Sequence, residues 1–206
     1  MEKLPFDLLK INADDVDALE ATYKALKENF KVGLIKDDAI RLKEFDMFTS
    51  HPEATIGGTL LINHPEDGCH LTFVKLRTVI QGGRGSAISY YKYQVWASAT
   101  LRSDFGRVMI RRETLVDKIL NVVHPVELRF DNDSSFSHRF FVAANDKEKA
   151  VSAISSDFRD AIGGIQMDDF IIEIANSTLV IGNVQPITPQ QTLYMAEFAT
   201  KLSTLK

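Results

Sequence analysis

The chain has 206 residues, of which 45% are hydrophobic and 25% charged, which is the balance of an ordinary globular protein. The formal net charge of -4 is divided unevenly, because residues 1–69 sum to -6, residues 70–130 to +6 and residues 131–206 to -4. The single cysteine, Cys69, excludes an intramolecular disulfide and any zinc site built on two or four cysteines, so we expect a hydrophobic core to hold the fold.

A first helix is predicted over residues 14–31. Aspartates stand at its beginning and lysines towards its end, a distribution that complements the helix dipole. Its apolar residues recur at helical spacing: Val16, Leu19, Tyr23, Leu26 and Phe30. Residues 32–35 then have the pattern of a short strand, whereas residues 37–48 fit a helix or a strand equally well.

Three longer β segments are predicted next. Residues 56–62 form a strand that Gly57 and Gly58 interrupt, and a polar turn follows over residues 63–68. Residues 70–81 and 87–101 are long β-type segments on either side of a glycine-rich loop, residues 82–86. We therefore predict a long hairpin in the middle of the chain.

The apolar faces of this hairpin predict its register. If they match, Val74 lies opposite Val95 and Arg77 lies opposite Lys92, since a slip of one residue would send every side chain to the other face. The second face then carries basic and aromatic side chains, and we select four of them as a candidate binding patch: Lys75, Arg77, Lys92 and Trp96. The favoured alternative is that another element covers this face and that acids of the flanking segments pair with its cations.

The remainder of the chain alternates short strands and helices. A short helix is predicted over residues 114–123, ended by Pro125, and a longer one begins at Asn145, with a break near residues 155–157. Thr188 and Pro189 open the last helix as cap and first residue. Strands are predicted over residues 108–111, 126–130, 139–143, 170–175 and 178–184, and a polar connection over residues 131–137.

This order of elements favours an α+β fold with a largely antiparallel sheet, a long central hairpin and several packed helices. We expect a single domain over residues 1–206, or two packed subdomains over residues 1–105 and 106–206. The predicted core is formed by Val74, Leu76, Tyr93, Val95, Val151, Ile154, Phe158, Ile172, Phe198 and Leu202.

The sequence also indicates a compartment. No apolar stretch approaches the eighteen or so residues that span a bilayer, so we expect no membrane insertion. The first residues combine an early acid, Glu2, with Pro5, which is unlike a secretory signal. We therefore expect a cytoplasmic protein.

One region resembles a known family. Arg112 and Glu113 stand before a short predicted helix, a strand follows at residues 126–130, then the segment Phe-Ser-His-Arg-Phe-Phe-Val at residues 136–142, and Asp146 opens the next helix. Over residues 108–182 this pattern is similar to a bacterial family of unknown function. The resemblance implies a folded domain, and it implies no catalytic residue because that family has no established activity.

Complete catalytic and metal motifs are missing from the sequence. His64, Glu66, Cys69 and His70 contain metal-ligating side chains, yet their spacing fits no known site and a solvated turn is the better interpretation. The glycine-rich loop at residues 82–86 lacks the Lys-Ser or Lys-Thr ending of a phosphate-binding loop. We therefore expect no catalytic residue, no metal and no cofactor.

The candidate patch leaves three hypotheses for the function. The first is a module without catalytic activity that binds a protein partner or a small anionic ligand. The second is an enzyme of unassigned class with a site built from loops. The third is a weak nucleic-acid binder, because basic residues between aromatic ones can neutralise phosphate and stack on bases; the acidic chain as a whole makes nucleic acid an unfavoured partner.

Overall fold

The computed structural model describes residues 4–35, 40–49, 53–63, 68–81, 87–113 and 126–205. The described helices are α1 (Ala13–Asn29), α2 (Ser134–Arg139), α3 (Lys147–Ala153), α4 (Ser156–Gly163) and α5 (Pro189–Ser203), with two 3-10 turns, η1 (Leu42–Glu44) and η2 (Asp46–Phe48). The described strands are β1 (Val32–Ile35), β2 (Thr55–Ile62), β3 (Cys69–Gln81), β4 (Ala87–Thr100), β5 (Arg107–Arg112), β6 (Val126–Glu127), β7 (Phe140–Ala144), β8 (Ile171–Ala175) and β9 (Thr178–Gly182).

These strands form one nine-stranded sheet in the order β1-β2-β3-β4-β9-β8-β5-β7-β6. Every described neighbouring pair is antiparallel, which confirms a mixed α+β fold with an antiparallel sheet. The long strands β3 and β4 take the third and fourth positions, and β9 takes the fifth. Among the described strands, the first four join the last five only through β4 and β9, while the division into subdomains stays a prediction.

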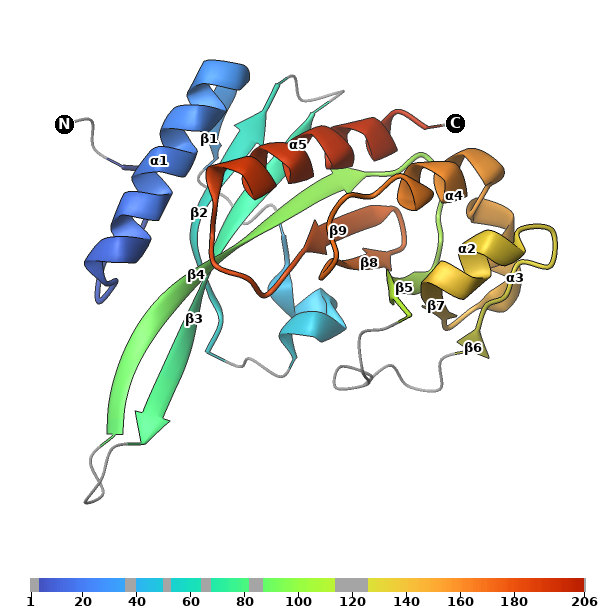
Figure 1. Cartoon of the computed structure of the whole chain (residues 1–206), viewed down its shortest axis with the longest axis horizontal. Helices are drawn as coiled ribbons and strands as arrows, with labels where there is room; N and C mark the ends of the chain where they lie inside the picture. Colours follow the sequence, from blue (N-terminus) through green and yellow to red (C-terminus); the bar gives the residue numbers. More distant parts are fainter. Residues whose placement is uncertain are drawn as a thin grey trace.

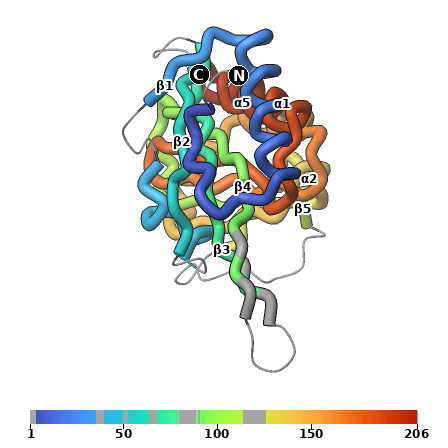
Figure 2. Tube along the Cα trace, turned by 90° about the vertical axis from the view of Figure 1, so that its left-hand side faces the viewer, coloured from blue at the N-terminus to red at the C-terminus, as the bar shows by residue number. Residues whose placement is uncertain are grey.

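The helices cover one face of the sheet (Figure 1). Leu19, Tyr23 and Leu26 of α1 pack there, and α5 lies beside α1 over β3 and β4 (Figure 2). Both helices are locally specified: the side chain of Asn12 caps α1 by accepting from the N–H of Asp15, and that of Thr188 caps α5 by accepting from the N–H of Gln191.

The opposite face has a smaller cover. Residues 40–48, predicted as a helix or a strand, instead form the two 3-10 turns, and Phe45, Met47 and Phe48 pack on Val74 and Trp96. The two faces of β3 and β4 are therefore both buried within the body of the protein.

This double burial explains why the predicted hairpin register is wrong. Phe73 lies opposite Val95 and Val74 opposite Gln94, one residue away from the expected pairing. Lys92 lies opposite Leu76, so Arg77 and Lys92 are on different faces of the sheet. Apolar matching cannot fix a register when each face carries apolar residues, because it assumes that only one face is buried.

The predicted core is confirmed at nine of its ten positions. The exception is Val151, which is 44% exposed on the outer side of the short helix α3. The predicted break in this region is confirmed, since the hydroxyl of Ser155 accepts from the N–H of Phe158 and starts α4. The predicted polar connection at residues 131–137 is wrong, because Asp133 caps α2 there. The helix predicted at residues 114–123 lies outside the described residues.

Candidate functional site: the ribbon of β3 and β4

Strands β3 and β4 extend beyond the strands beside them. Pairing of β2 with β3 ends at Lys75, and pairing of β9 with β4 ends at Trp96. Six register pairs, from Leu76 with Lys92 to Gln81 with Ala87, continue past these limits. We call residues 76–81 and 87–92 the ribbon and the rest of the described protein the body. Figure 1 shows the ribbon projecting away from the helices and the rest of the sheet.

The outer edges of the ribbon carry backbone groups that no neighbouring described strand pairs. Such edges are ready to accept another extended segment. The chain itself makes a contact of one residue there, because Ile11 forms an isolated parallel bridge with Tyr91 on β4. Arg77 is the partner of Tyr91 on the β3 side, so Ile11 takes the other edge of β4.

A half-buried ion pair lies at the base of the ribbon. The side chain of Lys75 is only 5% exposed, and its ammonium donates to Oδ2 of Asp7 at 2.7 Å. It also lies 4.8 Å from the centre of the Tyr91 ring. The hydrogen bond from Lys75 lowers the pKa of Asp7, so this carboxylate is charged at neutral pH. Lys75 therefore already interacts with groups of the protein itself, Asp7 and the Tyr91 ring.

The N-terminal segment brings Asp7 to this place. The Tyr93 hydroxyl donates to the carbonyl oxygen of Asp7 at 2.6 Å, and the Asp7 N–H donates to the carbonyl oxygen of Gly57 at 2.8 Å. Burial raises the pKa of the Tyr93 hydroxyl above its ordinary value, which keeps it a donor. The segment thus crosses the sheet where the body ends and the ribbon begins.

Gly57 and Gly58 make this crossing possible. A β carbon on Gly57 would overlap the ring of Tyr93, and one on Gly58 would stand 2.8 Å from Cδ1 of Phe6. The pairing of β2 with β3 is irregular between Ile56 and Gly58. Two glycines inside a strand are a sequence signal that another part of the chain comes close to the backbone there, but they do not indicate which part.

The other predicted patch residues are divided between two faces. Arg77 shares a face with Lys75 and donates to both carboxylate oxygens of Glu53, at 3.0 and 2.9 Å. Lys92 lies on the opposite face, as does Trp96, which is 2% exposed and makes an edge contact with Phe48 at 5.1 Å. The four side chains therefore do not form one patch, and binding by Arg77 or Lys92 stays a prediction.

Glu173 holds the cover over Trp96. This buried carboxylate on β8 accepts from the backbone N–H groups of Asp46 and Met47, at 2.8 and 3.1 Å, and lies 3.2 Å from the guanidinium of Arg107. Burial raises its pKa. The sequence analysis missed this anchor, because an acid inside an apolar strand gives no indication of its partner.

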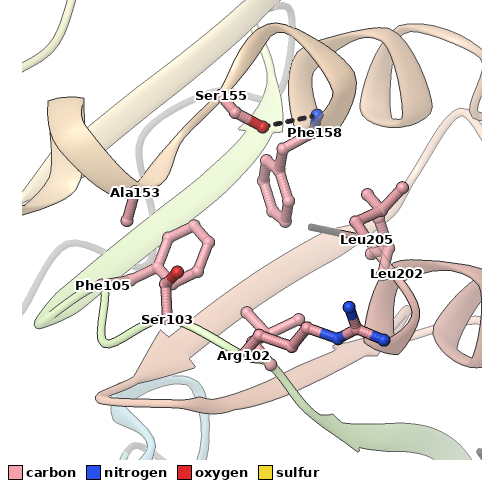
Figure 3. Close-up of a pocket in the computed structure, with 9 residues that line it drawn as sticks. Arg102, Ser103, Phe105, Ala153, Ser155, Phe158, Leu202 and Leu205 are labelled. Atoms are coloured by element: carbon pink, nitrogen blue, oxygen red, sulfur yellow. Dashed lines mark hydrogen bonds between the residues drawn. The ribbon is translucent and has the colours of Figure 1, made fainter.

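A polar cavity of about 330 Å³ lies beside Arg107. Its cations are already paired: Arg107 with Glu173 and Asp46, and Lys149 with Asp104 at 2.7 Å. A second cavity, between Phe105, Phe158 and Leu202, holds only about 20 Å³, roughly the space of one water molecule (Figure 3). The cations of the first cavity are therefore engaged, and the second, although Arg102 lines it, has no room for more than about one water molecule.

The residues weighed as metal ligands do not gather within the described part of the chain. Cys69 is buried under α5, where its thiol donates to the carbonyl oxygen of Ala196 at 3.5 Å, and burial raises its pKa to about 11. Desolvation lowers the pKa of His70. His64, Glu66 and the glycine-rich loop lie outside the described residues, and no group of three potential ligands is found among the described ones.

Comparison with known proteins adds little to this geometry. No protein-family model matches the chain, and no curated protein matches it. A solved structure to which it is similar is the crystal structure of the mycobacterial trehalose monomycolate transport factor A, with 12% sequence identity over 89% of this chain and 92% of that chain, and a TM-score of 0.45. The resemblance to a bacterial family over residues 108–182 stays a prediction.

One further finding concerns membranes. Among the helices that the structure describes, none is both long enough and apolar enough to span a bilayer.

Proposed function

We propose that the protein is a binding module and that its ribbon binds an extended, acidic segment of a partner protein. The observation that carries this proposal is the run of six register pairs beyond the reach of β2 and β9. A two-stranded ribbon is marginally stable by itself in water. Its extension away from the core therefore serves recognition better than it serves stability.

The mode of binding follows from the outer edges of the ribbon, which no neighbouring described strand pairs. An added strand satisfies the backbone groups of a sheet edge, and alternate side chains provide the specificity. The parallel bridge between Ile11 and Tyr91 supports this mode, since one residue of the chain itself already pairs with that edge.

The charge of the segment supports an acidic partner. Residues 76–92 contain three basic residues and no acidic one, and no acid occurs between Asp67 and Asp104. Complementary charge raises the rate of encounter and suppresses wrong partners. A small anion in the Arg107 cavity is the less favoured ligand, because Glu173 and Asp46 already pair with that guanidinium. A catalytic function is less favoured as well, since Cys69, Tyr93 and Glu173, whose pKa values are raised, lie at separate places.

The test uses a variant in which an Asn-Gly turn replaces residues 78–90. Arg77 and Tyr91 are directly paired, so a two-residue turn closes the shortened hairpin without changing the body. The probe is a fluorescent peptide of alternating glutamate and valine, and binding is measured by anisotropy. We expect the shortened variant to fold and to bind the peptide at least about tenfold more weakly.

Two controls separate strand addition from simple charge attraction. A peptide with alternate backbone nitrogens methylated keeps its charge but loses edge donors, and should bind at least about tenfold more weakly. Arg77→Glu should weaken binding more than Lys24→Glu, a matched exposed cation on α1 that also has an acidic neighbour, Glu28. Equal binding by the full and shortened chains would contradict the proposal, as would preference for single-stranded DNA or anionic vesicles.

A further inference from the structure

A cavity of about 530 Å³ lies where β9 ends and α5 begins. Its walls come from residues 166–169 on one side and residues 183–191 on the other. This volume is within the range of small-molecule binding sites. None of the ribbon residues lines it, so it is independent of the proposed partner-binding surface.

Asn183 is the buried polar group of this cavity. Its residue is only 6% exposed, and its amide oxygen accepts from the backbone N–H of Gln185 at 3.2 Å. This bond fixes which end of the amide is oxygen, and the described residues give the amide nitrogen no hydrogen-bond partner. This nitrogen is not among the described side-chain atoms that are fully buried without a partner, so its N–H groups reach the cavity surface and are available to a group inside the cavity.

The other polar walls supply acceptors. Asp168 and Asp169 are exposed carboxylates at the rim, and one oxygen of Asp169 accepts from the side-chain amide of Gln185 at 3.0 Å. Gln166 and Gln191 add side-chain amides. The cavity therefore joins the amide donor of a largely buried residue with a rim of negative charge.

This combination selects the chemistry of the ligand. An anion accepts from Asn183 but is repelled by Asp168 and Asp169. An ammonium group pairs with the carboxylates but only donates, so it leaves the Asn183 nitrogen without a partner. A hydroxyl both donates and accepts, and neighbouring hydroxyls satisfy both sets at once. We propose that the cavity binds a neutral ligand with adjacent hydroxyl groups, of the sugar class, through Asn183 and Asp168.

The test follows the amide resonances of the nitrogen-15-labelled full chain during titration with methyl glucosides, galactosides and mannosides. We expect at least one of them to shift resonances of residues 166–169 and 183–191. Asn183→Asp keeps the acceptor for the Gln185 N–H and replaces the amide donor with a negatively charged oxygen, so it should weaken binding at least about tenfold.

Asn145→Asp is the matched control. Asn145 also accepts a backbone N–H, that of Arg107 at 2.9 Å, but it lines the other polar cavity, so sugar binding should be unchanged. If Asn183→Asp fails to fold, the exposed Asp168→Ala gives the same test, with an expected loss of at least about tenfold. No shift with any sugar, unchanged affinity in these variants, or binding of phosphate or putrescine at the same resonances would overturn the proposal.

Discussion

Strands β3 and β4 run through both the body and the ribbon, but what packs against them differs between the two regions. In the body, Phe73 and Val74 of β3 are fully buried on opposite faces, under the helices and under the 3-10 turns. In the ribbon, Val79 of the same strand is 51% exposed, and the pairing is with β4 alone. Both parts of β3 have similar strand propensity. The elements that cover the strand, and not its propensity, therefore distinguish the buried part from the exposed part.

The first prediction tests the body. Phe73→Ala removes a fully buried ring that packs 4.4 Å from the ring of Phe6. The free energy of unfolding should fall by about 3 to 5 kcal/mol, because the lost burial and the cavity left behind both cost stability. Urea denaturation followed by tryptophan fluorescence measures this change. A loss below about 1 kcal/mol would show that the ring is not packed as described.

The second prediction concerns the boundary between the two regions. Gly57→Ala places a methyl group where the ring of Tyr93 lies. The strand or the ring must shift, which should cost about 1 to 3 kcal/mol of unfolding free energy. Gly33→Ala is the control, since its nearest neighbour would be Cβ of Leu61 at 3.6 Å. Thermal unfolding of both variants should show a clear loss only at position 57.

The third prediction concerns how the contribution of the Asp7–Lys75 pair, at the boundary between body and ribbon, to the stability of the fold depends on pH. The hydrogen bond from Lys75 holds the pKa of Asp7 below its usual 3.8, so this carboxylate stabilises the fold above that pH. The contribution is lost as pH falls from about 3.8 through the lower pKa of the folded state.

Asp7→Asn removes this contribution. It should cost about 1 kcal/mol at neutral pH, a value reduced from that of a buried pair because the Asp7 side chain is 53% exposed. The difference from the parent should close below pH 3.8. Urea titrations at several pH values measure it, and a constant difference would exclude the Lys75 ion pair as its cause.

The fourth prediction has the smallest effect and concerns the ribbon. Val79→Ala should change the free energy of unfolding by less than about 0.5 kcal/mol, because the side chain is largely exposed and leaves no cavity. The comparison with Phe73→Ala, six residues earlier on β3, measures directly how much the cover contributes. A loss similar to that of Phe73→Ala would mean that the ribbon packs against the body.

The sequence predicted best the elements whose signals are local. The last helix begins at Pro189 with Thr188 as its cap, as expected, and Ser155 starts a new helix after the break. The short helix α2 was not predicted, although Asp133 has the position of a cap. Its segment is mostly polar, and the apolar pair Phe136 and Phe140 is too short a signal for a helix.

The candidate site was less accessible to sequence reasoning. Lys75 and Asp7 are far apart in the chain, and no local pattern connects them. The 3-10 turns that cover Trp96 carry too few residues for a recognisable period, so the sequence did not show which segment covers this face of β4. The register error followed from the same cause, since the second cover was invisible.

The pairing of β4 with β9 imposes an order on the folding of the chain during its synthesis. Trp96 packs directly over Gly182, where a β carbon would stand 2.8 Å from Cζ3 of the indole, yet the two residues are far apart in the chain. At about 5 to 20 residues per second, a ribosome takes on the order of several seconds to add the intervening chain. Throughout that time β4 has no partner on this edge, and the nascent N-terminal half is exposed to mispairing until β9 leaves the ribosome.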